Sequence, residues 1–261
     1  MDRTRKILIA AMAAGLAFAA SPAGAQSEAP SCGAPSELTR LDEAITHTTA
    51  HLADGHSLRI VAFGSSSTAG AGASSPAHSY PSRLEAALRE RYPEMDITVL
   101  NRGIGGEDAR EMLARLDRDV IAEHPDLVLW QVAVNAIVDD ATVPQEAALV
   151  RAGLARMKAA GIDVVIVDPQ YAPKVIAKPH AGAMVKMLET VAQRAHVAVF
   201  HRFAIMGHWR VTERVPFAQF TSHDGLHMND WSYDCVAKLM ANAIVDAANR
   251  PVAVATHGAR S

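Results

Sequence analysis

The chain has 261 residues and a formal net charge of −3 at pH 7, from 25 Lys and Arg against 28 Asp and Glu. A mildly acidic chain without a run of basic residues gives no support for nucleic-acid binding. The length suits one α/β domain with a well-buried core, whereas two domains would each be at the small end of the usual range.

The first 25 residues predict a secretory signal peptide. Three basic residues precede an apolar run at about 7–20, and small residues at 23–25 form a cleavage site. The run is shorter than the roughly 20 residues of a membrane span, so an uncleaved anchor is the less favoured alternative. Cleavage would remove 25 of 261 residues and leave 236, and losing three basic residues and one acid would take the charge from −3 to −5. We expect a periplasmic or secreted protein without stable membrane insertion.

The next segment, 26–36, is rich in Ser, Pro, Ala and Gly and is interpreted as a linker or N-terminal arm. The stretch that follows has apolar residues spaced roughly for one helical face, which predicts a helix over 37–52. We expect one domain over 37–250 and a C-terminal tail over 251–261.

Short β-branched runs then alternate with longer helical patterns. The predicted strands are 58–63, 97–100, 127–132, 164–167 and 197–200, and the predicted helices are 82–91, 108–123, 145–160, 182–195 and 230–249. Continuous apolar strands alternating with helices are typical of buried parallel sheets with right-handed crossovers. The pattern predicts a flavodoxin-like three-layer α/β sandwich with a five-stranded parallel sheet. Ligands in such folds bind beyond the carboxyl ends of the strands.

The chain has two cysteines, Cys32 near the predicted mature N-terminus and Cys235 in the last predicted helix. An exported chain meets an oxidising environment, so we expect these two to pair. The bridge would close a long loop, nominally worth several kcal/mol. Two unrelated buried thiols are the alternative, because sequence alone does not place two Cα atoms within reach.

A candidate nucleophile follows the first predicted strand. Gly64 precedes three serines, and a serine at a sharp strand-to-helix turn exposes its hydroxyl and its own N–H to a substrate. Ser65, Ser66 and Ser67 compete for this role. Serines and glycines after a strand are also ordinary loop residues, so the segment alone is weak evidence.

A candidate base and its orienting acid lie just before the last predicted helix, in Asp224-Gly225-Leu226-His227. The three-residue separation across a glycine turn lets the carboxylate reach the imidazole Nδ1–H, so that Nε2 can accept a proton from serine. The alternative is a capping aspartate beside a surface histidine. Asn229 is the expected N-cap of the helix.

Two further segments offer oxyanion donors. The loop Gly103-Ile104-Gly105-Gly106 follows the second strand and can present backbone N–H groups, and Asn135 follows the third strand with a side-chain amide. Each is also an ordinary turn or capping residue when considered singly.

Together these segments resemble the SGNH hydrolase family, or GDSL esterases, whose blocks contribute Ser, Gly, Asn and His in this chain order. The resemblance covers about Arg59 to the final helix. It implies a nucleophile at Ser66, oxyanion donors at Ser66, Gly106 and Asn135, and a base at His227 oriented by Asp224. It implies no cofactor and no metal.

The sequence departs from the family pattern at two places. Ser65 stands where the family usually has aspartate, which affects local hydrogen bonding rather than the nucleophile. Ala133 and Val134 precede Asn135 where glycine or threonine is more usual, so the backbone there must accommodate bulkier residues.

The resemblance implies an exported serine esterase that forms an acyl-enzyme, with short acyl groups, chiefly acetyl, on carbohydrate as the first expected substrate. An acyltransferase or lysophospholipase with the same site is an alternative, and a catalytically idle carbohydrate-binding domain is an alternative of another class. A metal-dependent hydrolase using His223 and His227 around Asp224, together with His201 or His208, is less favoured, because no His-Glu-x-x-His is present. Oligomeric state is not predicted.

Two sequence features bear on specificity. The stretch 170–180 follows the fourth strand and is a candidate wall of the site. A set of large apolar residues is either an acyl pocket or part of the core, with the core favoured: Met184, Met187, Phe203, Met206 and Trp209.

Overall fold

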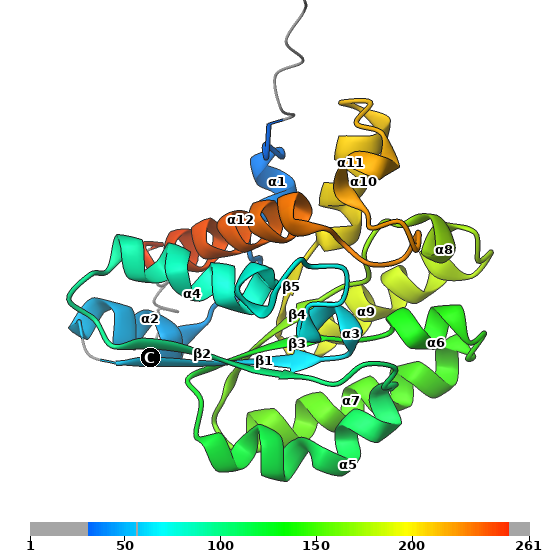
Figure 1. The fold of residues 1–261 in the computed structure, drawn as a ribbon. Coiled ribbons are helices and arrows are strands. Elements are labelled where there is room, and N and C mark those ends of the chain that lie inside the picture. The colour runs from blue at the N-terminus through cyan, green and yellow to red at the C-terminus, as the bar shows by residue number, and fades with distance from the viewer. Residues whose placement is uncertain (1–30, 56, 251–261) are drawn as a thin grey trace, which may run out of the picture. The chain divides into compact units, whose positions relative to one another are not determined.

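The computed structural model describes residues 31–55 and 57–250 (Figure 1). The expected signal peptide and C-terminal tail lie outside the described residues, as do residues 26–30 of the expected N-terminal arm. The elements are, in order, α1 (Ser36–Thr39), α2 (Thr46–Asp54), β1 (Leu58–Gly64), α3 (Ser66–Ala69), η1 (Pro76–His78), α4 (Tyr80–Arg91), β2 (Ile97–Gly103), α5 (Ala109–Asp119), η2 (Ile121–Glu123), β3 (Leu127–Gln131), α6 (Val134–Val138), α7 (Val143–Ala159), β4 (Asp163–Val167), α8 (Pro173–Ile176), α9 (Ala181–Ala195), β5 (Ala198–Phe200), α10 (Arg202–Val211), α11 (Phe217–Phe220) and α12 (Asp230–Ala248).

Five parallel strands form one sheet in the order β2-β1-β3-β4-β5. This is the flavodoxin-like strand order, so the predicted fold is confirmed. The chain leaves β1 for β2 on one side and later returns to place β3 on the other. The crevice beyond the carboxyl ends of β1 and β3 is therefore the switch point at which such sheets bind ligands.

Both faces of the sheet are covered by helices. Ile60 and Ala62 of β1 belong to the apolar cluster that contains residues of α2, α4, α10 and α12, whereas Val61 and Phe63 belong to the cluster with α5, α7 and α9. Figure 1 shows α4 and α12 on one side of the sheet and α5 and α7 on the other. Burial on both faces explains why the strands are continuous apolar runs rather than alternating patterns.

The expected single helix over 37–52 is wrong: the structure has two shorter helices, α1 and α2, separated by a non-helical segment. Leu41 and Ile45 have the spacing of one helical face, but both enter the core from that segment, each with 1% of its surface exposed. These side chains are therefore buried in the core although the segment between them is not helical. The predicted helix 108–123 similarly ends at Asp119, and a short 3₁₀ turn, η2, follows.

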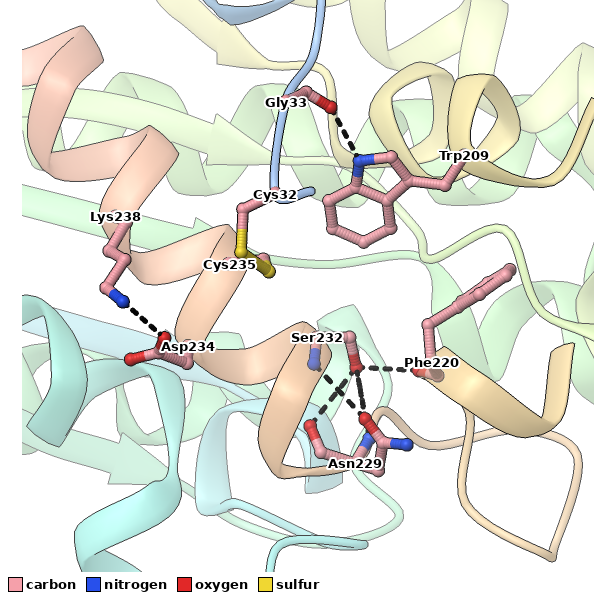
Figure 2. Close-up of a disulfide and its surroundings, with 9 residues drawn as sticks. All are labelled: Cys32, Gly33, Trp209, Phe220, Asn229, Ser232, Asp234, Cys235 and Lys238. Atoms are coloured by element: carbon pink, nitrogen blue, oxygen red, sulfur yellow. Dashed lines mark hydrogen bonds and ion pairs between the residues drawn. A yellow bond between two sulfur atoms is a disulfide. The ribbon is translucent and has the colours of Figure 1, made fainter. Parts of the chain in front are cut away.

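The N-terminal arm is fastened to the C-terminal helix by the predicted disulfide between Cys32 and Cys235, whose Cα atoms are 5.1 Å apart (Figure 2). Beside it, the Trp209 indole N–H donates to the Gly33 carbonyl at 2.9 Å. The arm is therefore tied to α12 by a covalent bond and to α10 by a hydrogen bond. Among the helices that the structure describes, none is long and apolar enough to cross a membrane.

Candidate active site

Ser66, His227 and Asp224 form a continuous hydrogen-bonded chain. Ser66 is the first residue of α3, directly beyond β1, and its Oγ lies 2.8 Å from His227 Nε2. His227 Nδ1 lies 2.5 Å from Asp224 Oδ2. The two neighbouring serine hydroxyls face other partners: Ser65 donates to Gln131 Oε1 at 3.1 Å and Ser67 donates to Gln170 Oε1 at 3.4 Å. Of the three candidate nucleophiles, Ser66 alone lies against the imidazole.

The Asp224 carboxylate is held by several donors. Its Oδ1 accepts from the Ser222 hydroxyl at 2.7 Å and from the backbone N–H groups of Leu226 and His227 at 2.9 and 3.0 Å. Partial burial by itself would raise the pKa of Asp224, but hydrogen bonds from Ser222, His227 and the backbone outweigh it and hold that pKa well below its usual value. The group is therefore an anion that fixes the imidazole orientation.

The loop after α3 packs directly on His227. Gly72 has φ +87°, and a Cβ placed there would lie 2.3 Å from the Met228 carbonyl oxygen and 3.0 Å from His227 Cβ. Only glycine permits this approach together with this backbone conformation. The packing leaves 16% of the His227 side chain exposed.

The glycine loop after β2 lies against Ser66, since a Cβ built on Gly105 would be 3.9 Å from Ser66 Cβ. Gly106 has φ +86°, a conformation that favours glycine. Within the described residues, no hydrogen bond occupies the backbone N–H of Ser66 or that of Gly106. Both N–H groups are thus available to an oxygen of a bound molecule.

Asn135 lies in the first turn of α6, beyond β3, and its Nδ2 donates to the Glu107 carbonyl at 2.7 Å. One amide hydrogen thereby holds the glycine loop, and the second remains for another acceptor. Ala133, just before α6, has φ +73°. This left-handed conformation explains why a smaller residue is usual at that position in the family that the sequence resembles.

Arg115 of α5 anchors the same loop and was not predicted from the sequence. Its side chain is 6% exposed and forms an ion pair with Glu107, the residue after Gly106. The guanidinium also donates to the carbonyls of Arg102 and Gly64, at 3.0 and 3.1 Å. It therefore connects the ends of β1 and β2 to the glycine loop.

Of the apolar residues considered for an acyl pocket, Met184, Met187, Met206 and Trp209 are buried in the two core clusters. The core interpretation holds for these four, and Phe203 packs edge-on against Tyr171 with ring centroids 5.0 Å apart.

The stretch 170–180 borders the turn 224–227, the proposed catalytic turn. Gln170 Nε2 donates to the Leu226 carbonyl at 3.0 Å, and the Lys174 N–H donates to the Gly225 carbonyl at 3.0 Å.

Across the described residues, no group of three or more His, Cys, Asp or Glu is arranged to hold a metal ion. His208, one of the candidates, instead pairs with Glu213 at 3.2 Å.

Comparison with known proteins gives a family match and similar folds over most of the chain, and a short match to one relative. The model of the Non-GDSL lipase-like family matches residues 31–250. An acetylxylan esterase of Geobacillus stearothermophilus is 38% identical over 58 residues, which cover 22% of this chain and 26% of that protein. The chain thus matches about a quarter of the length of this relative.

Two solved structures illustrate the similarity of fold. A two-domain esterase active on acetylated mannans has a TM-score of 0.66 at 19% identity, over 82% of this chain and 56% of that one. A lipase/acylhydrolase from Enterococcus faecalis has a TM-score of 0.60 at 23% identity, over 72% and 95%. The family match, which spans the sheet and all the segments described above, shows that the chain belongs to the Non-GDSL lipase-like family.

Proposed function

We propose that this protein is an exported serine esterase that removes short acyl groups, chiefly acetyl, from carbohydrate. The observation that carries the proposal is the hydrogen-bonded chain Ser66–His227–Asp224 beside a glycine loop with unused N–H groups. Similarity to an acetylxylan esterase and to an esterase active on acetylated mannans supports the choice of acetylated carbohydrate. Export rests on the signal-peptide pattern of residues 1–25.

In the acylation step, His227 Nε2 accepts the hydroxyl proton as Ser66 Oγ bonds to the ester carbonyl carbon. The carbonyl oxygen becomes an oxyanion, which accepts hydrogen bonds from the N–H groups of Ser66 and Gly106 and from the free amide hydrogen of Asn135. As the tetrahedral intermediate collapses, the bond to the alcohol breaks and His227 transfers its proton to that oxygen. The sugar hydroxyl leaves, and the acyl group remains on Ser66.

In the deacylation step, His227 takes a proton from water while the water oxygen attacks the acyl carbon. The second tetrahedral intermediate releases the acid, and the proton returns to Ser66 Oγ. Asp224 remains ionised throughout and stabilises the imidazolium that forms in each step.

The first test compares Ser66→Ala with Ser67→Ala on p-nitrophenyl acetate. The Ser66 variant should lose at least about 10⁴-fold in kcat/KM, because neither the nucleophile nor its proton remains. Ser67→Ala removes an adjacent hydroxyl that faces Gln170, and should retain activity within about tenfold. Substantial turnover by a well-folded Ser66→Ala protein would refute the proposal.

The second test addresses the substrate. Release of acetate from acetylated xylo- and manno-oligosaccharides, compared with hydrolysis of p-nitrophenyl esters of increasing acyl length, should favour the acetyl glycans. Added alcohols or sugars that capture the acyl group would instead identify a transferase, and preference for long acyl chains would contradict the carbohydrate assignment.

Export is tested by sequencing the N-terminus of the protein recovered from the periplasm or the culture medium. A protein that still carries residues 1–25 would contradict cleavage at the predicted site.

A further inference from the structure

A hollow of about 410 Å³ is lined by residues in or beside α8, α10 and α11, and the catalytic proposal does not use it. Figure 1 shows where these three helices lie. The hollow is lined by Tyr171, Ile176, Arg210, Val211, Arg214 and Phe217. Its α8 wall adjoins the catalytic turn, because the Lys174 N–H donates to the Gly225 carbonyl. Gln170, which precedes Tyr171, contacts both Ser67 and Leu226. The residues that line the hollow at Tyr171 and α8 are therefore joined by hydrogen bonds of their chain neighbours to the turn that carries Asp224 and His227.

Two aromatic rings line the hollow. Tyr171 and Phe217 have ring planes 14° apart and centroids 6.2 Å apart. Tyr171 is further fixed by Phe203 and by Gly207 of α10, where a Cβ would already lie 3.4 Å from the ring. Half-buried, fixed aromatic faces present a negative quadrupole at low entropic cost, which suits the polarised C–H bonds of a sugar ring.

The hollow is also positively charged in a chain whose net charge is negative. The Arg210 guanidinium lies 5.1 Å from the Phe217 ring centroid, and Arg214 stands beside it in the turn before α11. Across the part of the chain that the structure describes, neither arginine forms an ion pair, and the intervening Glu213 is engaged with His208. Two guanidinium groups that have no ion-pair partner among the described residues, one of them over the Phe217 ring, match a ligand that carries both a ring and a carboxylate.

We propose that this hollow is a subsite for an acidic sugar, a hexuronate, on the acetylated glycan whose ester reacts at Ser66. The pyranose ring lies on Tyr171 and Phe217, and its carboxylate pairs with Arg210 and Arg214. The exposed side chains of Ile176 and Val211 form the apolar rim. This assignment rests on the proposed function and adds to it a preference for glycans that carry uronate.

The experiment compares three substrates: p-nitrophenyl acetate, an acetylated xylo-oligosaccharide, and the same oligosaccharide with a glucuronate branch. The variant is Arg210→Gln/Arg214→Gln, and its matched control is Arg151→Gln/Arg194→Gln, which removes two exposed arginines on α7 and α9. The hollow variant should raise KM for the branched substrate about tenfold, as expected for two partly exposed ion pairs. Its kinetics on the other two substrates, and all kinetics of the control, should match wild type.

High salt should reduce the wild-type preference for the branched substrate, because the contacts are charged and exposed. Equal kcat/KM of wild type for the branched and unbranched oligosaccharides would overturn the proposal, as would an unchanged KM in the hollow variant.

Binding to the Ser66→Ala protein separates this inference from the proposed function. Calorimetric titration with the glucuronate-bearing oligosaccharide should give binding that weakens when Arg210 and Arg214 are replaced, whether or not acetate is released by the active enzyme. Such binding without hydrolysis of any acetylated glycan would refute the proposed substrate and keep the subsite. Hydrolysis of both oligosaccharides with no arginine-dependent binding would refute the subsite alone.

Discussion

The turn that carries Ser66, residues 65–68, is held in place by one buried acceptor, Gln131, at the end of β3. Its Oε1 accepts from the Ser65 N–H at 3.0 Å, from the Ser65 hydroxyl at 3.1 Å and from the Thr68 hydroxyl at 3.1 Å. The donors are all buried, and the Ser65 N–H and hydroxyl have no other partner among the described residues, whereas the Thr68 hydroxyl also lies 3.3 Å from the Tyr80 hydroxyl. Gln131 thus fixes both sides of Ser66 without contacting it, as a positioning residue.

Replacing Gln131 with Leu should lower the free energy of unfolding by about 2 to 3 kcal/mol, because buried donors lose their acceptor. It should also lower kcat more than it raises KM, since the Ser66 backbone N–H would no longer be held in place. Gln131→Glu keeps an acceptor oxygen and should recover most of kcat. Urea denaturation and p-nitrophenyl acetate kinetics measure both effects.

A stable Gln131→Leu protein with wild-type kcat would contradict the positioning role. A protein that loses stability while keeping kcat, measured where it is fully folded, would reduce Gln131 to a structural residue.

The sequence predicted the roles of those residues that lie in short recognisable motifs. Ser66 follows a glycine at a strand end, and Asp224 and His227 are three residues apart across a glycine turn, so geometry follows from short spacing. Gln131 and Arg115 have no such pattern. Each acts on carbonyls or amides brought near by the sheet, 66 and 51 residues away in sequence for Ser65 and Gly64, and only the folded sheet reveals the contact.

Helix α12 supports two features of the fold. It begins at Asp230, just after His227, and its second turn carries Cys235 of the disulfide. The Asn229 side chain caps the helix by accepting from the Ser232 N–H, as predicted. The Ser232 hydroxyl in turn donates to the Phe220 carbonyl at 2.6 Å, which joins α12 to α11 (Figure 2). Local capping therefore holds the helix start in place independently of the disulfide farther along the helix.

The double variant Cys32→Ala/Cys235→Ala should lower the free energy of unfolding by up to about 5 kcal/mol, because the bridge closes a loop with a sequence separation of 203 residues. It should leave kcat near wild type, since the caps of α12 remain. Urea denaturation of wild type and variant, with kinetics in the absence of denaturant, checks both. Equal stability would indicate a denatured state already compact around this arm, and lost kcat would show that the arm supports the catalytic turn.

Elements with strong periodicity were predicted and irregular ones were not. The strands and the long helices α4, α7, α9 and α12 agree with the sequence patterns to within a few residues. Two segments do not agree with the sequence patterns: 37–52 was predicted as one helix that the structure does not have, and the helix α10 was not predicted. In the first, buried Leu41 and Ile45 imitate a helical face; in α10, Phe203, Met206 and Trp209 are spaced for a helix but were considered singly as pocket or core residues.

For the whole molecule, strand–helix alternation was enough to predict the doubly wound sheet, because buried parallel strands admit few connections. It did not predict two buried carboxyl groups, those of Asp168 and Glu146. Asp168 is fully buried, and burial raises its pKa to about 7 although the Phe203 N–H and Arg202 oppose the shift. Glu146 of α7 is also buried; burial, followed by the nearby Asp108 carboxylate, raises its pKa to about 7, and its Oε1 has no hydrogen-bond partner among the described residues.

These carboxyls make the stability of the whole fold depend on pH. A glutamate whose pKa is 4.5 when unfolded and about 7 when folded retains its proton in the native state between these values while the unfolded chain releases it. The native state is therefore fully favoured below pH 4.5 and loses this contribution as the pH rises to 7. Above pH 7 the buried anion is a constant cost.

Glu146→Gln removes that cost, so the variant should gain stability relative to wild type between pH 5 and pH 8, by on the order of 2 kcal/mol. Urea denaturation of both proteins at the two pH values, with the disulfide intact, measures the difference. Glu94→Gln, which removes an exposed carboxylate in the loop before β2, is the matched control and should show no comparable gain. An equal stability difference at pH 5 and pH 8 for Glu146→Gln would mean that Glu146 ionises alike in the folded and unfolded chains, and that burial in α7 is compensated by a donor such as an internal water.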